Sequence, residues 1–147
     1  MDDQAIPVLV SLQSSAAPEG EEPETISLMT AGELHKTTEG YRLRYEETLD
    51  ESVPPTQVEL ILENGVATMH RMGDYDVNMV FRKGQRYEGQ YHTPYGDMDL
   101  ALYCTKVQYT VTPKEGDLRL QYQLDINGQF VAMHKLELSF SPKECKA

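Results

Sequence analysis

Cysteine, basic residues and long apolar runs are all scarce in this chain, and each scarcity excludes a class of protein. Only two cysteines occur, Cys104 and Cys145, and neither has a neighbour at metal-ligand spacing, so we expect free thiols and neither a disulfide framework nor a metal site. The 13 Lys and Arg face 24 Asp and Glu, and the resulting net charge of −11 argues against nucleic acid as a partner. No apolar run approaches the ~18 residues of a membrane-spanning helix, and the mean hydropathy is −0.52. We therefore expect no membrane partner.

Catalytic and targeting signals are missing as well. The chain has no Ser-His-Asp arrangement, Gly-rich phosphate loop, CxxC or HExxH motif, so nothing predicts an enzyme or a cofactor. The first residues, Met1 to Gln4, are acidic and resemble neither a signal peptide nor a transit peptide. We expect a cytoplasmic protein.

What the chain contains in abundance is alternation of apolar and polar residues, interrupted by Gly, Pro or Asn. Alternation with a period of two is typical of antiparallel strands that have one buried face and one solvated face. It predicts about ten strands and no amphipathic helix. The strand segments are 6–14, 26–36, 41–47, 58–63, 66–72, 77–82, 87–91, 98–104, 107–111, 118–126 and 130–140.

The clearest hairpin signal is Asn64-Gly65, because these two residue types tolerate the positive φ angles of a type I′ turn. A two-residue turn fixes the register of the strands on either side. Pairing across it sets Leu62 opposite Ala67, Leu60 opposite Met69 and Val58 opposite Arg71. Asn127-Gly128 predicts a second hairpin of this kind.

Three other segments are predicted to connect strands. Residues 16–23 are polar and acidic and suit a loop. Residues 49–56 include Pro54-Pro55, which cannot join a ladder, so we expect a connection that crosses one end of the sheet. Thr93 to Gly96 forms a tight turn, in which Pro supplies a fixed φ and Gly a permissive one.

Short sequential turns and alternation on almost every strand favour one architecture. We predict an all-β fold in which residues 1–147 form a single domain, a closed antiparallel up-and-down barrel of about eight to ten strands. Closing the sheet also removes exposed edges. An interior of this size is either packed solid or holds one small ligand, so the barrel alone does not decide the function.

Three motifs, in this order and spacing, resemble the YwiB-like family of small bacterial proteins. They are the run Tyr41 to Glu47, the corner His70 to Gly73 and the turn Tyr91 to Gly96. The resemblance covers most of the chain and implies a closed barrel of the lipocalin and calycin type. It implies no activity, because the family is a domain of unknown function. True lipocalins usually carry a Gly-x-Trp motif, and this chain has no Trp, so a secreted-lipocalin function is not transferable.

The candidate ligand site consists of polar residues that fall on the inward face of predicted strands. A charge that faces a closed interior is costly unless it is paired. We hypothesise that the barrel interior binds a small ligand that is either apolar or amphipathic with an anionic head. Arg71 and tyrosine hydroxyls would hold the anionic head, since a guanidinium meets a carboxylate or phosphate through two hydrogen bonds. The candidate residues are Arg71, Glu47, Tyr45, Tyr91, Tyr109, Tyr122 and His134.

There is one alternative for the Arg71 site and another for His134. In the first, Arg71 and Glu47 form a structural ion pair near one mouth of a filled barrel. The protein would then act as an interaction or assembly protein through its outer surface, and the outward-facing Val80, Tyr103 and Val131 would belong to a homodimer surface. For His134, the alternative to a general base or pH switch is a hydrogen bond to a neighbouring group.

Overall fold

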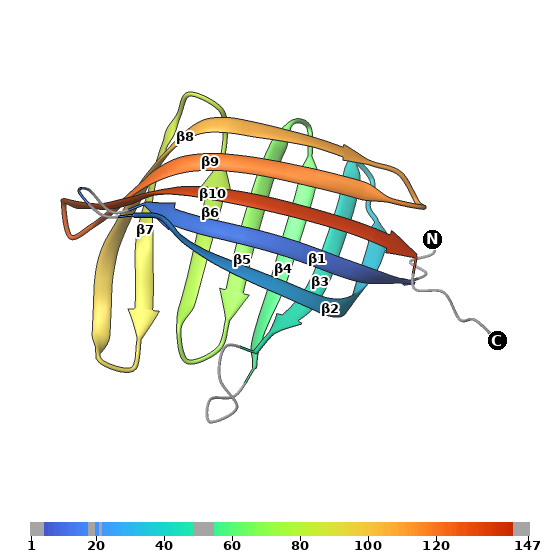
Figure 1. Ribbon diagram of the computed structural model, residues 1–147, viewed down its shortest axis with the longest axis horizontal. Helices are drawn as coiled ribbons and strands as arrows, with labels where there is room; N and C mark the ends of the chain where they lie inside the picture. Colours follow the sequence, from blue (N-terminus) through green and yellow to red (C-terminus); the bar gives the residue numbers. More distant parts are fainter. Residues whose placement is uncertain (1–4, 18–19, 21, 49–54, 143–147) are drawn as a thin grey trace.

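The computed structural model of the protein describes residues 5–17, 20, 22–48 and 55–142, and over these residues it contains ten strands and no helix. Figure 1 shows how the strands follow one another through the molecule. Their bounds are β1 Ile6–Ala17, β2 Glu24–Lys36, β3 Gly40–Glu47, β4 Thr56–Glu63, β5 Val66–Met72, β6 Asp76–Phe81, β7 Arg86–Thr93, β8 Gly96–Val111, β9 Gly116–Ile126 and β10 Gln129–Pro142.

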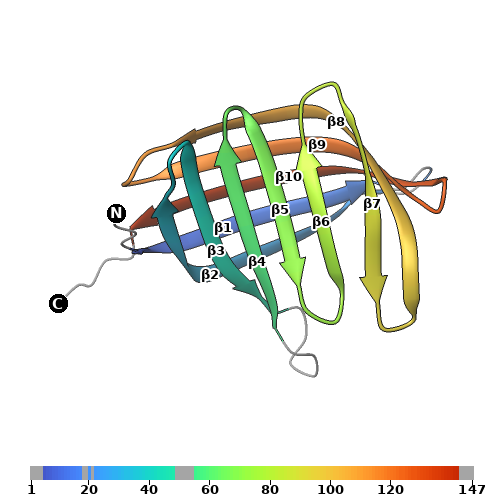
Figure 2. The same cartoon turned by 180° about the vertical axis from the view of Figure 1, so that it is seen from behind.

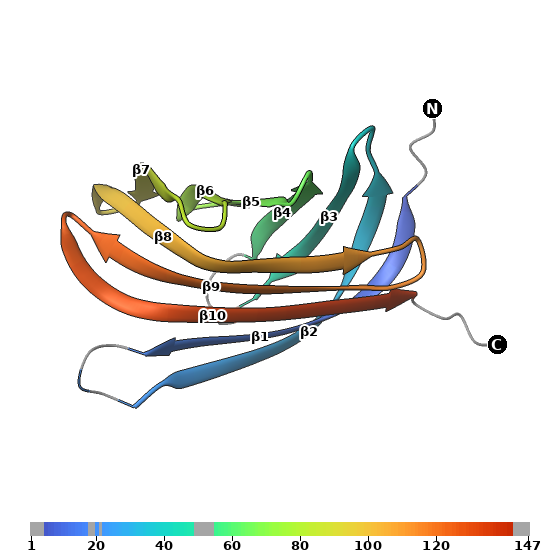
Figure 3. The same cartoon turned by 90° about the horizontal axis from the view of Figure 1, so that it is seen from above.

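The strands form one closed antiparallel barrel in which each strand pairs with its neighbours in sequence and β10 pairs with β1. This confirms the prediction of an up-and-down barrel. One wall consists of β8, β9, β10, β1 and β2 and lies in front in Figure 1. The other wall consists of β3 to β7 and lies in front in Figure 2, where the molecule is seen from behind. Seen from above, the two walls face each other across the interior (Figure 3).

The hairpin at Asn64-Gly65 has the predicted register. Val58 pairs with Arg71, Leu60 with Met69, and Leu62 with Ala67. Both turn residues have positive φ, 54° for Asn64 and 77° for Gly65, which is what a type I′ turn requires. The register matters for function because it sets the position of Arg71 in the wall.

The core is apolar and follows from the alternation. Every second residue of each strand points inward, and most of the inward side chains are Leu, Val, Met or Phe. The largest fully buried side chains are those of Phe81, Leu34, Leu43, Leu60, Met69, Leu102, Leu118 and Leu120. The phenyl ring of Phe81 also packs against Tyr122, with the ring centroids 4.8 Å apart.

The structure corrects the sequence analysis in a few places. Ala16 and Ala17 belong to β1 and are not part of a loop, and Thr56 begins β4. Residues 98–104 and 107–111 lie in one strand, β8, which contains a bulge between Cys104 and Lys106. The bulge explains why the inward residues change from even to odd numbers along this strand. Most of the predicted 49–56 connection lies outside the described residues.

Pairing is uneven around the barrel, and this opens one side of it. Strand β2 pairs with β3 only from Gly32 to Lys36, and β6 pairs with β7 through two residue pairs only. Over residues 24–31, β2 has a partner on one side, β1, and none on the other side among the described residues. This side of the barrel, between the first half of β2 and the ends of β3, β5 and β7, is called the mouth below.

Candidate functional site

Three of the candidate residues lie in one row across the wall that β3 to β7 form. Tyr45 pairs with Val58, Val58 with Arg71, Arg71 with Val77, and Val77 with Tyr91. Paired residues on adjacent strands point to the same face of a sheet. The inward alternation and the Asn64-Gly65 register therefore bring Tyr45, Arg71 and Tyr91 to the same level of the interior.

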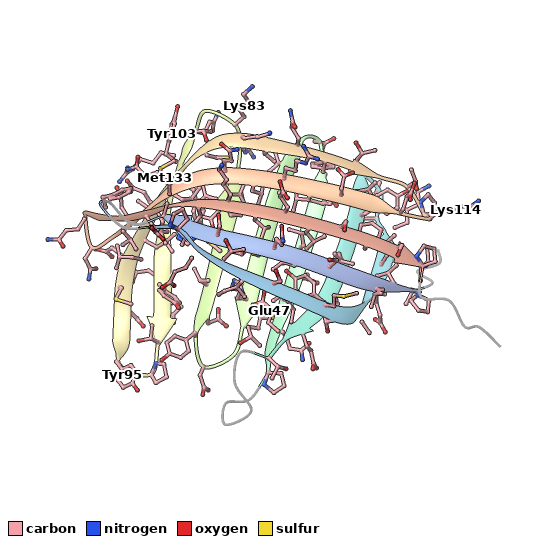
Figure 4. The ribbon with its side chains drawn as sticks, viewed as in Figure 1. Glu47, Lys83, Tyr95, Tyr103, Lys114 and Met133 are labelled. Carbon is pink, nitrogen blue, oxygen red and sulfur yellow. The ribbon has the colours of Figure 1, made fainter. Side chains whose placement is uncertain are left out.

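Arg71 forms an ion pair with Glu47, the last residue of β3. Its Nη1 donates a hydrogen bond to Oε1 of the Glu47 carboxylate. Glu47 is 6% exposed, whereas the Arg71 side chain keeps 29% of its surface exposed. Figure 4 shows Glu47 at the lower side of the barrel, where the mouth opens. Burial by itself lowers the pKa of Arg71, but the negative charge of Glu47, with smaller contributions from Tyr45, the Glu47 hydrogen bond and Tyr122, raises it above its ordinary value.

The hydroxyls of Tyr45 and Tyr122 face this ion pair and remain protonated. Burial raises the pKa of Tyr122 to about 12, with Arg71 acting in the opposite direction. Burial and the negative charge of Glu47 raise the pKa of Tyr45 well above its ordinary value. The Tyr45 hydroxyl is buried and has no hydrogen-bond partner among the described residues. An unpaired buried hydroxyl costs stability, so this group calls for an explanation.

His134 and Tyr91 complete the cluster. The imidazole of His134 stacks on the Tyr122 ring at 5.1 Å, with an angle of 8° between the planes. Burial lowers the pKa of His134, and the positive charge of Arg71 lowers it further, so the ring is neutral near pH 7. Burial also raises the pKa of Tyr91. The cluster thus contains one carboxylate, one guanidinium, one imidazole and three phenol hydroxyls.

The seventh candidate, Tyr109, lies elsewhere. Its hydroxyl accepts a hydrogen bond from the backbone N–H of Gly65 at 2.8 Å, so it sits at the opposite end of β5 from Arg71. One residue beside the cluster, Tyr75, was missed from the sequence. The ring of Tyr75 lies 6.2 Å from that of Tyr91. Tyr75 is in the turn before β6, where alternation gives no signal.

Several hollows in the described part of the chain open to solvent. Five of them have volumes of 180 to 720 Å³, and neither Arg71 nor Glu47 lines any of these five. The 720 Å³ hollow lies where β2 and β3 separate, and Gly32 and Tyr45 both line it. Within the described residues, no three His, Cys, Asp or Glu side chains are grouped to hold a metal ion. Cys104 is free and buried, and Cys145 lies outside the described residues.

The ten strands of the described residues form a closed, meandering antiparallel barrel, which is a calycin-like fold, and a polar cluster lies at its mouth. The chain belongs to the family described as Domain of unknown function (DUF1934), whose model matches residues 10–138. This confirms the family that the three motifs resemble.

A solved structure agrees with this assignment at the level of the fold. The structure titled "Crystal structure of ywiB protein from Bacillus subtilis" matches with a TM-score of 0.85 and 18% sequence identity, and the match covers 95% of this chain and 94% of that one. A comparison with curated proteins finds no match. None of the described residues forms a helix long and apolar enough to cross a membrane.

Proposed function

We propose that this protein is a cytoplasmic binding protein for a small amphipathic molecule, whose anionic head lies beside Arg71 at the mouth of the barrel. The observation that carries the proposal is the buried Tyr45 hydroxyl, which has no partner among the described residues although it faces the Arg71–Glu47 pair. A ligand oxygen placed there would satisfy this hydroxyl.

The balance of donors and acceptors supports an acceptor-rich head group. A guanidinium has five N–H donors, and the Arg71–Glu47 hydrogen bond uses one of them. The protonated hydroxyls of Tyr45 and Tyr122 add further donors, whereas the one carboxylate is already paired. A carboxylate or phosphate head would accept several of these bonds.

The apolar part of the ligand has a wall to lie on. Leu28, Leu124 and Ile126 are partly buried and pack against the core. The centre of the barrel is filled by fully buried side chains such as Phe81 and Leu60. The ligand is therefore expected to occupy the mouth and not an enclosed lumen.

A thermal-shift series tests the proposal with laurate as the probe and dodecanol as its uncharged control. We expect laurate to raise the melting temperature of the wild type, and dodecanol to raise it less. Tyr45→Phe removes only the unpaired hydroxyl, so the fold should persist while the laurate shift decreases. Equal shifts for laurate and dodecanol, or an unchanged laurate shift in both Tyr45→Phe and Arg71→Met, would contradict the proposal.

A second function has its own support on the outer surface. Tyr103 and Met133 are 43% and 40% exposed, and each pairs with Gln123 between them, so they lie on the same outward face (Figure 4). Val131, close by on β10, is 41% exposed. This outward face suits a protein partner, and the Arg71–Glu47 pair would then be structural.

A further inference from the structure

We propose that the free edge of β2, residues 25–31, pairs with the same edge of a second copy of this chain, so that two barrels share a continuous antiparallel sheet. This inference goes beyond ligand binding and rests on different observations. Three of them carry it: the unpaired backbone of the edge, the absence of devices that protect edges, and the distribution of charge.

The direction of the backbone groups follows from the β2–β3 turn. The N–H of Thr37 donates to the carbonyl of Gly40 at 2.9 Å, so residue 37 directs its backbone groups toward β3. Backbone groups alternate sides along a strand, and neither ladder of β2 contains a register shift. The odd-numbered residues Thr25, Ser27, Met29 and Ala31 therefore direct their N–H and C=O groups toward the free edge.

The edge is open and lacks protection. Figures 1 and 3 show the first half of β2 at the margin of its wall with no strand beside its outer edge. Ile26 is 56% exposed and Met29 is 66% exposed. Natural proteins protect such edges with Lys, Pro, bulges or very short strands. Residues 25–31 contain no Lys and no Pro, and the described strand has no bulge there.

The distribution of charge favours a second copy of this chain as the partner of the free edge. Each chain carries a net charge of −11, so two copies repel unless they meet at an uncharged surface. The chain has 13 Lys and Arg and 24 Asp and Glu, but none of them lies in residues 5–17, which include β1, or in residues 25–32 of β2. These two strand segments are thus a neutral stretch of an acidic molecule, flanked on β2 by Glu24 and Glu33. The free edge within this stretch is the place where like chains can approach without opposing charges.

The edge is also complementary to itself. Two-fold antiparallel pairing centred on Leu28 sets Ser27 opposite Met29 of the second copy and Thr25 opposite Ala31. These are the residues whose backbone groups face outward, so they form the hydrogen-bonded pairs of an antiparallel ladder. No like charges face each other across this ladder, and addition of a strand to an open edge is a common mode of recognition.

Light scattering coupled to size-exclusion chromatography tests the proposal on the full chain. The protein concentration should be raised to about 200 µM, because a single strand pair makes a small interface and the dimer is then weak. The wild type should approach twice the chain mass of 16.7 kDa. Ser27→Pro removes an N–H that faces the free edge, a position where an edge strand tolerates Pro, and should elute as a monomer. Ser27→Ala keeps the N–H and should remain a dimer.

Met29→Glu is a second test that leaves the backbone intact. It adds like charges on either side of the two-fold axis, so it should also give the monomer mass. Circular dichroism checks that each variant keeps its sheet content. A wild type that stays monomeric over the whole range would overturn the proposal and leave the edge to a different partner. A dimer that survives both Ser27→Pro and Met29→Glu would also overturn it, because the interface would then lie elsewhere.

Discussion

At the scale of single residues, the Arg71–Glu47 pair has the most buried carboxylate among the salt bridges of the described residues. Glu47 is 6% exposed, so removal of its partner leaves a buried carboxylate without a counter-charge. Loss of one partner of a fully buried pair costs about 3–5 kcal/mol. The Arg71 side chain is 29% exposed, which moderates this cost.

We therefore predict that Arg71→Met lowers the free energy of unfolding by about 2 kcal/mol. Glu47→Gln in the same background should recover part of the loss, because the unpaired charge is gone. Urea unfolding of the wild type, both single variants and the double variant measures the coupling. Additive losses in the double variant would show that the two side chains do not interact.

His134 gives the cluster a dependence on pH whose direction follows from its burial. Its pKa is lower in the folded chain than in the unfolded chain, so the unfolded chain binds the proton more readily. Its contribution to stability is complete above about pH 6.5 and is lost as the pH falls toward the lower folded pKa.

His134→Phe should reduce this dependence, because the new ring can still stack on Tyr122 but cannot take up a proton. Between about pH 7 and pH 5, the unfolding free energy of the variant should fall less steeply than that of the wild type. Urea midpoints at several pH values measure the two slopes. The carboxylates titrate in both proteins, so the comparison isolates His134, and identical slopes would rule out the predicted contribution.

At the scale of strands and turns, the β4–β5 hairpin holds Arg71 in register. Gly65 has φ of +77°, and a Cβ added there would have no atom within 4 Å, so a side chain at this position meets only the backbone penalty. We predict that Gly65→Ala lowers stability by about 1 kcal/mol. Gly116→Ala should cost more, because its Cβ would come within 2.6 Å of the Phe140 ring. Denaturant unfolding of both variants checks the order, and a reversed order would contradict it.

Strands and turns could be predicted from the sequence where a local residue pattern determines them. Alternation identified the strands and their inward faces, and Asn64-Gly65 set Val58 opposite Arg71. Alternation gives the face of a side chain but not its height along the barrel. Tyr109 was therefore grouped with Arg71 although the two lie at opposite ends of β5, and the bulge after Cys104 changed the inward parity of β8 without a sequence signal.

The separation of β2 from β3 was also beyond sequence analysis. Strand β3 alternates regularly, whereas β2 breaks the alternation at Met29, Thr30 and Ala31. Neither pattern states that the two strands pair only from residue 32 to residue 36 of β2. Their divergence depends on how the β1–β2 hairpin is directed by the rest of the barrel. The mouth and the free edge both result from this long-range property.

At the scale of the whole molecule, the barrel combines a filled centre with a polar mouth. Fully buried apolar side chains account for the stability of the closed sheet. Charged and hydroxyl groups gather where β2 leaves β3, and the Arg71 side chain, 29% exposed, is the partner of the ion pair that water or a solute can reach. The fold thus places the candidate site at a gap between strands, with the core behind it.

Chemical-shift mapping locates the site at which an anionic amphipathic molecule binds. In ¹H–¹⁵N spectra of the labelled protein titrated with laurate, we predict saturable shifts at the amides of Tyr45, Glu47, Arg71 and Tyr91. Shifts confined to the outer face around Tyr103 and Met133, or no saturable shifts at all, would contradict binding at the Arg71 cluster.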